Sequence, residues 1–224
     1  MNNLILFGGG LGAGKDTMRE LLIDKLGINK EYHFSFALPL KNEANRFIEA
    51  VKNGKTPKEI SDEFNISIED ALRGIDILGD TPNLYPEVNA RSRTAEVRRF
   101  LQYWGTDVRR KQNKNYWVDI ANQIISEKLA AGYTVIVTDG RFCNEYDLVN
   151  NLGGYTICLY VSEDERCKRV LERDGILPSK DALNHASEKD WKIYEKFTYK
   201  INSDNMTAEA TADEIIKNVF DLQL

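Results

Sequence analysis

The sequence predicts an α/β fold in which helices cover both faces of a mostly parallel sheet. Short apolar segments alternate with amphipathic helical segments, which is the pattern of parallel β-α units. The strongest apolar segments lack the polar alternation of half-exposed strands, as strands buried on both faces do. At 224 residues, the chain has room for one domain with an insertion, or for two small domains.

The strands are predicted from continuous apolar runs. Tyr133–Asp139 is the strongest of them because it is unbroken and rich in β-branched residues. Leu4–Phe7 is short and runs directly into glycines. The complete set of predicted strands is Leu4–Phe7, Tyr32–Ala37, Tyr133–Asp139, Tyr155–Val161 and Phe197–Ile201.

The helices are predicted from apolar residues three and four positions apart. In Asp16–Leu26, Met18, Leu21 and Leu22 have this spacing, and Gly27 ends the helix. Thr207 is a candidate N-cap for the last helix. The predicted helices are Asp16–Leu26, Lys41–Lys52, Thr94–Tyr103, Trp117–Ala131, Asp164–Asp174, Lys189–Lys196 and Thr207–Leu222.

Residues 54–93 differ in character from the rest of the chain. They contain Pro57, Pro82 and Pro86, three of the chain's five prolines, and several short helical pieces. Thr56–Phe64 begins with a Thr-Pro helix start, and Ser67–Leu72 begins with a serine cap. We therefore expect a helical insertion here.

Composition excludes several classes of protein. The chain is 42% hydrophobic and 29% charged, which suits a folded, water-soluble protein. Its net charge of −5 argues against a non-specific nucleic-acid binder. There is no apolar run of the roughly 20 residues that a membrane helix needs, and no signal peptide at the start. Three cysteines without a CxxC pair indicate reduced thiols rather than disulfides or a zinc site.

The glycine-rich turn matches the phosphate-binding P-loop, G-x4-G-K. Residues 9–17 are Gly-Gly-Leu-Gly-Ala-Gly-Lys-Asp-Thr, between a strand and a helix. Glycines let backbone N–H groups face an anion, the helix N-terminus attracts it, and Lys15 adds a point charge. The residues expected to bind ATP are Gly10, Gly12, Ala13, Gly14, Lys15, Asp16 and Thr17.

Two carboxylates near this loop are candidates for metal binding. Asp16 stands where the motif usually has the Ser or Thr that contacts Mg²⁺. It could hold the metal, act near the transferred phosphoryl group, or only favour the helix N-terminus electrostatically. Asp139 follows the strongest strand, at the end where parallel sheets bind ligands; a capping aspartate is the alternative. Arg141 favours a phosphate site. We expect Lys15, Asp16, Asp139 and Arg141 to be catalytic, with Asp16 and Asp139 as Mg²⁺ ligands.

Five stretches together resemble the phage-type deoxynucleoside monophosphate kinases, a branch of the P-loop nucleoside monophosphate kinases. They occur in that family's order and span nearly the whole chain. They are GAGKDT (12–17), FALPLK (36–41), VRRFLQYWGTDVRR with YWVD (97–110 and 116–119), VIVTDGRFCNE (135–145) and HASE (185–188). One departure is Cys143, where the family's DxRFPNE has proline; this removes a φ restraint but no catalytic group.

The resemblance implies a three-layer P-loop NTPase fold in a single domain over 1–224. A helical acceptor-binding insertion would span about 54–93, and a lid about 164–188. The implied reaction is transfer of the γ-phosphoryl group of ATP to a deoxynucleoside monophosphate with Mg²⁺. The implied partners are small nucleotides, without nucleic acid or membrane, and family members are often homodimers. The expected location is the cytoplasm, or the host cytoplasm if the chain is phage-encoded.

The resemblance also implies residues for the acceptor. Arg98 is chosen over Arg99 because it shares a helix face with Gln102, four residues on. Gln102 would bind the base, and Tyr103 or Trp104 would stack on it, although a core role for Trp104 stays open. Lys41 could equally be a surface lysine. The implied acceptor-binding residues are Lys41, Arg98, Gln102, Trp104, Arg109, Arg141 and Glu145.

The lid is expected to carry arginines. Arg166, Arg169 and Arg173 are spaced to share one helix face, from which they could close on phosphates. The alternative is a solvated face paired with neighbouring glutamates. His185 and Glu188 match the family motif near the end of the lid.

Two other functions remain open from the sequence. One is a P-loop kinase for another small acceptor, of the phosphomevalonate or dephospho-coenzyme A type. The other is a nucleotide-binding regulator or DNA-binding module, because residues 56–72 superficially resemble a helix-turn-helix. That stretch is acidic, and its second helix lacks base-reading side chains, which argues against DNA binding.

Overall fold

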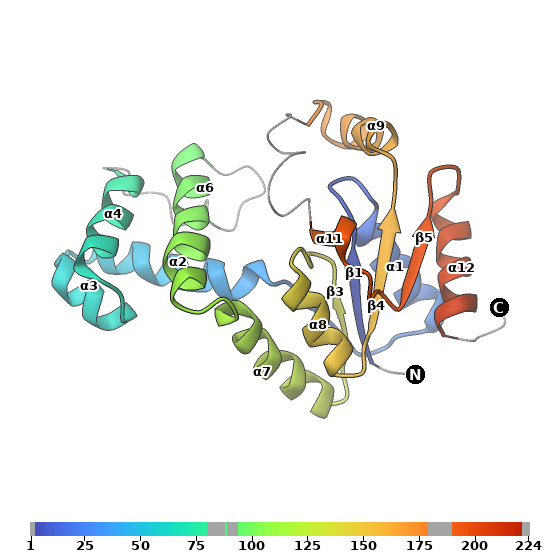
Figure 1. Ribbon diagram of the computed structural model, residues 1–224, viewed down its shortest axis with the longest axis horizontal. Coiled ribbons are helices and arrows are strands. Elements are labelled where there is room, and N and C mark those ends of the chain that lie inside the picture. Colours follow the sequence, from blue (N-terminus) through green and yellow to red (C-terminus); the bar gives the residue numbers. More distant parts are fainter. Residues whose placement is uncertain (1–2, 80–87, 89–93, 179–189, 221–224) are drawn as a thin grey trace. The chain divides into compact units, whose positions relative to one another are not determined.

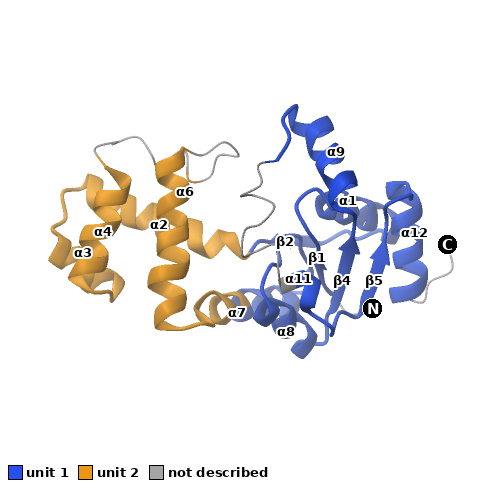
Figure 2. Cartoon of the chain, turned by 45° about the horizontal axis from the view of Figure 1, so that its top comes forward, with its two compact units in different colours: residues 1–35, 122–224 blue, residues 36–121 orange. Residues whose placement is uncertain are grey.

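The computed structural model describes residues 3–79, 88, 94–178 and 190–220. The chain divides into two compact units (Figure 2). Unit 1 comprises Met1–Ser35 and Asn122–Leu224, and unit 2 comprises Phe36–Ala121. The insertion expected over 54–93 falls inside unit 2, which begins earlier and ends later. None of the helices in the described ranges has the length and apolarity to cross a membrane.

Unit 1 is built on a parallel five-stranded sheet in the order β2-β3-β1-β4-β5 (Figure 1). The strands are β1 (Leu4–Gly8), β2 (Glu31–Phe34), β3 (Thr134–Val137), β4 (Tyr155–Tyr160) and β5 (Tyr199–Asn202). β1 lies in the centre, between β3 and β4. Along the chain, β2 and β3 are added on one edge of β1, and β4 and β5 are then added on the other edge. The carboxyl end of β1 is therefore the topological switch point, where α/β sheets bind ligands.

Helices cover both faces of this sheet, which explains why β1 is buried at every position. Ile5 and Phe7 join the apolar cluster formed with α1 (Lys15–Leu26) and α12 (Ala208–Val219). On the opposite face, Leu4 lies close to Val149 of α8 (Cys143–Asn151), around Gly154. The other helices of this unit in the described ranges are α9 (Glu163–Asp174), the short α11 (Asp190–Ile193) and the larger part of α7 (Tyr116–Ala130). The α/β fold with a parallel sheet is confirmed.

Unit 2 is helical and has its own core. Its elements are α2 (Ala37–Lys52), α3 (Pro57–Phe64), α4 (Ile68–Leu78), α6 (Ala95–Gln102), the π-helix η1 (Tyr103–Arg110) and the start of α7 (Tyr116–Ala130). Phe47, Phe64, Phe100 and Trp104 pack as an aromatic cluster, with ring centroids 4.8 to 5.7 Å apart. This burial of large rings holds α2, α3 and α6 to η1.

Several helix starts predicted from the sequence are confirmed. Thr56 caps α3 and forms a reciprocal capping box with Glu59. The side chains of Ser67, Thr94 and Thr207 cap α4, α6 and α12: each accepts a hydrogen bond from a backbone N–H of the first turn.

Three predicted boundaries were wrong. The second strand ends at Phe34 rather than Ala37, and α2 starts at Ala37 because Pro39 lies in its first turn, where no N–H is needed. The helix predicted to end at Tyr103 continues as η1. In η1, Gly105 packs closely on Leu40: a Cβ added to Gly105 would lie 3.2 Å from the Leu40 side chain. Helix α8 was missed because the start of its sequence was interpreted only as a motif.

Candidate functional site

The glycine loop joins β1 to α1 at the switch point. Gly9 (φ 130°) and Gly12 (φ 81°) adopt backbone conformations that favour glycine. A Cβ on Gly9 would lie 2.5 Å from the carbonyl oxygen of Leu159, and one on Gly12 would lie 2.7 Å from that of Arg166. Gly14 precedes α1 and has no side chain to cap it. The first N–H groups of α1 are thus presented toward whatever anion binds in the loop.

Lys15 folds back over this loop. Its Nζ donates to the carbonyl oxygens of Gly9 (2.8 Å) and Gly10 (2.9 Å). The ammonium group is therefore held above the loop, where a bound polyphosphate would offer stronger acceptors than neutral carbonyls. Asp16 and Thr17, in the first turn of α1, are exposed beside it.

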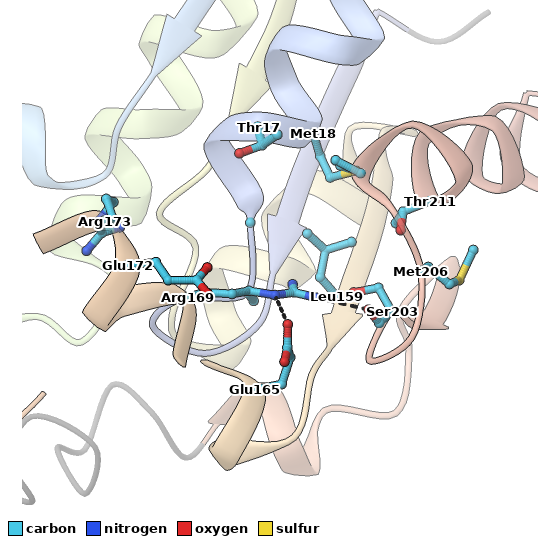
Figure 3. A pocket seen from close by; sticks show the side chains of 14 residues that line it. Thr17, Met18, Leu159, Glu165, Arg169, Glu172, Arg173, Ser203, Met206 and Thr211 are labelled. Atoms are coloured by element: carbon cyan, nitrogen blue, oxygen red, sulfur yellow. Dashed lines mark hydrogen bonds and ion pairs between the residues drawn. The ribbon is translucent and has the colours of Figure 1, made fainter. Parts of the chain in front are cut away.

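A pocket of about 480 Å³ opens beside the glycine loop (Figure 3). Its walls come from six parts of unit 1: the loop, α1, β4, α9, the turn after β5, and the start of α12. The side chains of Met18, Leu159 and Met206 form its apolar wall, while Arg169 and Arg173 bring positive charge from α9. Glu165 and Glu172 line the same α9 wall as the two arginines. An apolar wall and two arginines next to an anion loop suit a nucleotide, which has a flat base and a charged phosphate tail.

Two of the expected lid arginines line this pocket. Arg169 Nε donates to Glu165 (2.9 Å), and its Nη2 donates to the carbonyl oxygen of Ser203 (3.0 Å). It therefore links α9 to the turn after β5. Arg173 makes a two-pronged pair with Asp174, with distances of 2.7 and 2.6 Å. Hydrogen bonding to Asp174 raises the pKa of Arg173, and the nearby Asp16 carboxylate acts in the same direction.

Arg166 differs from the other two, although the spacing predicts a shared face. Its side chain is 3% exposed and does not line the pocket. It donates to the carbonyl oxygens of Val161 and Leu11, both at 3.2 Å. Leu11 belongs to the glycine loop, so Arg166 fastens α9 to the loop from within the protein. His185 and Glu188 lie outside the described residues.

Asp139 lies just beyond β3, next to the extension of β2. Its Oδ2 accepts a hydrogen bond of 2.5 Å from the Ser35 hydroxyl. One residue earlier, Thr138 pairs with His33 at 3.0 Å. Within the described ranges, no three His, Cys, Asp or Glu side chains gather as a complete metal site. Mg²⁺ nevertheless needs only one or two protein carboxylates when phosphates and water complete its coordination shell. Asp139 and Asp16 are therefore chemically suitable ligands for the ion.

Glu145 determines the backbone around Arg141. It is 2% exposed, and its Oε2 accepts from the N–H groups of Arg141 (2.7 Å) and Phe142 (3.1 Å) at the start of α8. The carboxylate therefore serves as a helix cap whose hydrogen bonds hold Arg141 at the carboxyl edge of the sheet. This position within unit 1 keeps Arg141 a candidate phosphate ligand.

In unit 2, Arg109 is held inside the protein. It is 4% exposed and lies over the rings of Trp104 and Tyr116, 5.1 and 4.9 Å from their centroids. Its guanidinium pairs with Glu43 and donates to Gln112 at 3.2 Å. The Arg109 guanidinium thus contacts two aromatic rings, Glu43 and Gln112, all within unit 2.

The aromatic residues proposed to stack on a base are also buried. Trp104 is fully buried among Phe47, Phe64 and Phe100. The Tyr103 hydroxyl donates to Asp70 at 2.8 Å, and burial raises the pKa of Tyr103. The burial of Trp104 favours the core role that its sequence left open. By contrast, Arg98 and Gln102 are exposed on α6, and Lys41 on α2 is partly exposed.

Comparison with known proteins assigns the family. The model of the family described as deoxynucleotide monophosphate kinase matches residues 75–181. A protein of Acanthamoeba polyphaga mimivirus, provisionally named a deoxynucleotide monophosphate kinase, is 31% identical over 166 residues, covering 69% of this chain and 72% of that protein. The chain belongs to the deoxynucleotide monophosphate kinase family. This makes it a phosphotransferase and a nucleotide kinase, and it confirms the resemblance noted in the sequence.

Solved structures agree on the fold of this family member. A protein from Thermus thermophilus aligns with a TM-score of 0.55 and 17% identity, over 99% of this chain and 98% of that one. A sugar kinase from Janibacter aligns with a TM-score of 0.50 and 13% identity, over 97% and 94%. At such low identity the likeness establishes the α/β P-loop kinase fold alone.

Two side chains of this kinase site were not found from sequence. Ser35 belongs to no motif, and its neighbour Asp139 is 104 residues away. Only the pairing of β2 with β3 brings them together. The role of Arg166 was also missed, because helical spacing gives the face of a residue but not what covers that face. A buried arginine on a helix with many charged residues has no separate sequence signal.

Proposed function

We propose that the kinase binds ATP at the glycine loop and the adjoining pocket, and transfers the γ-phosphoryl group to a deoxynucleoside monophosphate. The observation that carries this proposal is the glycine loop at the end of the central strand, opening into a pocket with Arg169 and Arg173 in its wall. Family membership supplies the acceptor class.

The donor would extend from the glycine loop toward the turn after β5. Its phosphates would accept hydrogen bonds from the loop N–H groups and from Lys15, whose Nζ would exchange the carbonyls of Gly9 and Gly10 for phosphate oxygens. The base would lie against the apolar wall formed by Met18, Leu159 and Met206. Arg169 and Arg173 would neutralise charge on the phosphates.

Asp139 and Asp16 would hold Mg²⁺, directly or through water. When bound, the ion would neutralise charge that develops between the β- and γ-phosphates. Phosphoryl transfer needs little covalent chemistry from the protein, so the main tasks of this chain's residues are to position the two substrates and to exclude water. Ser35 and Glu145 support these tasks by holding Asp139 and the Arg141 backbone.

The acceptor phosphate would bind to Arg141 of unit 1. Lys41, Arg98 and Gln102 stay candidates for the acceptor on the family resemblance alone. Arg109, Trp104 and Glu145 have other roles in this proposal, because each is buried and engaged with its own unit. The acceptor side thus depends on fewer cations than the sequence motifs implied.

An acceptor panel tests the proposal. With Mg²⁺ and ATP, release of ADP is measured with each of the four common deoxynucleoside monophosphates, the matching ribonucleotides, dephospho-coenzyme A and phosphomevalonate. We expect turnover with at least one deoxynucleotide and none with the last two. The Lys15→Ala variant should lose turnover by orders of magnitude while its melting temperature changes little. Turnover of only a non-nucleotide acceptor would contradict the proposal, and so would full activity of Lys15→Ala.

A further inference from the structure

The carboxyl ends of β2 and β3 are joined by side chains as well as by the sheet. The backbone register pairs His33 with Ile136 and Phe34 with Val137. The side chain of His33 contacts that of Thr138 at 3.0 Å. Beyond the paired residues, the Ser35 hydroxyl donates to the Asp139 carboxylate at 2.5 Å. Two consecutive side-chain links therefore lead to the carboxylate that follows the strand.

The Ser35–Asp139 hydrogen bond is of the strong kind. A hydroxyl that donates to a carboxylate forms a short, charge-assisted bond, and 2.5 Å lies at the short end of that range. Such a bond restrains the rotation of the carboxylate about its terminal torsion, for which intrinsic preferences are broad. Neither side chain is fully buried, so burial alone does not fix this carboxylate.

Ser35 also has a special place in the chain. It is the last residue of unit 1, and Phe36 is the first of unit 2. The hydrogen bond therefore anchors the chain at the point where it leaves the sheet for α2, which carries Lys41. The same contact that orients Asp139 fixes this exit point.

We infer that Ser35 is a positioning residue for phosphoryl transfer: its hydroxyl holds the Asp139 carboxylate in the orientation that the Mg²⁺–nucleotide requires. This inference rests on the proposed function and assigns Ser35 no contact with substrate. Loss of the hydroxyl removes one restraint on the orientation of the Asp139 carboxylate, which slows catalysis more than it weakens substrate binding.

Steady-state kinetics give the first test. Ser35→Ala should lower kcat about tenfold, which corresponds to one hydrogen bond to a charged group, with the KM for the acceptor changed less than about twofold. The matched control is Ser61→Ala, which removes a buried 2.7 Å hydrogen bond to the Ile66 carbonyl within unit 2. This control should leave kcat near that of the wild type. An unchanged kcat in Ser35→Ala would overturn the inference.

A double-mutant cycle gives the second test and needs no acceptor. The affinity for ADP is measured by calorimetry with Mg²⁺ and with chelator, in the wild type, Ser35→Ala, Asp139→Ala and the double variant. ATP turnover to ADP without acceptor is measured in the same four proteins. If Ser35 acts through Asp139, its removal has no further effect once Asp139 is absent. Additive effects in both measurements would overturn the inference. Because ADP binding is independent of the acceptor, a failed acceptor panel would not affect this result.

Discussion

Arg166 and Arg169 have the same side chain and lie on the same helix, yet their surroundings give them different tasks. Arg166 is buried and donates to two backbone carbonyls, one of them in the glycine loop. Arg169 is partly exposed in the pocket wall and contacts Glu165 and the Ser203 carbonyl. Arg166 therefore supports the glycine loop from within the protein, while Arg169 lines the pocket.

Alanine substitution should separate these two roles. Arg166→Ala leaves buried carbonyls without their donors and should lower the free energy of unfolding by about 2 kcal/mol. Arg169→Ala should change stability by less than about 1 kcal/mol, because its ion pair is partly exposed, but should raise the KM for ATP about tenfold. Urea unfolding and initial rates measure these effects. Equal stability losses in both variants would contradict the distinction.

At the level of secondary-structure elements, α9 packs directly on the glycine loop. The Arg166 side chain donates to the Leu11 carbonyl. The Arg166 carbonyl oxygen lies so close to Gly12 that a Cβ added to residue 12 would clash with it. Loop and helix therefore fit only if residue 12 is glycine. The close contact explains why a loop with several positive φ angles can be held in one conformation before a nucleotide binds.

Two glycine variants test this fit. Gly12→Ala should weaken ADP binding at least tenfold, because the new Cβ meets a backbone carbonyl that cannot rotate away. Gly132→Ala is the matched control: its φ of 78° is close to the 81° of Gly12, but a Cβ added there would meet nothing within 4 Å beyond its chain neighbours. It should lose about 1 kcal/mol of stability and keep its ADP affinity. Equal ADP affinities in both variants would contradict the role of the loop–helix contact.

Across the whole molecule, the two units divide the proposed work. The donor pocket and the candidate metal ligands lie entirely in unit 1, whereas Lys41, Arg98 and Gln102 belong to unit 2. Each unit has its own apolar core. A ligand that binds one unit should therefore stabilise that unit first.

Hydrogen exchange measures this division. Mg²⁺ with ADP should slow exchange in the glycine loop, α1 and α9, and leave α3 and α4 of unit 2 unchanged. An accepted deoxynucleoside monophosphate should slow exchange around Arg141 of unit 1. Protection of unit 2 alone by ADP would contradict the assignment of the donor to unit 1.

A thiol probe reports separately on the packing of the sheet. Cys158 on β4 is buried, and burial raises the pKa of its thiol to about 11, whereas Cys143 and Cys167 are partly exposed. Because the thiolate is the reactive form, iodoacetamide at pH 8.5 should modify Cys143 and Cys167 and spare Cys158 until the protein unfolds. Mass spectrometry of digests measures the order. Early modification of Cys158 would contradict the packing of β4.

Local patterns along the chain were enough to predict the sheet, the donor loop and the family. Strands that are buried on both faces have continuous apolar sequences, which can be recognised locally. A phosphate-binding loop requires glycines and a lysine at fixed spacing, which can also be recognised locally. Capping residues such as Thr56 and Thr207 also act within one turn and were found. The extension into η1 was not found, because it depends on packing against a distant residue, Leu40. The start of α2 and helix α8 were also not found, although Pro39 and the Glu145 cap lie within their first turns.

Which charged and aromatic side chains are buried became clear only from the three-dimensional packing. Arg109, Trp104 and Arg166 carry motif or spacing signals, yet their side chains are buried among partners far along the chain. The link between Ser35 and Asp139 spans 104 residues and exists only because β2 and β3 are neighbours. The residue type limits what a side chain can do, but burial and strand order, which depend on the whole chain, determine what it meets.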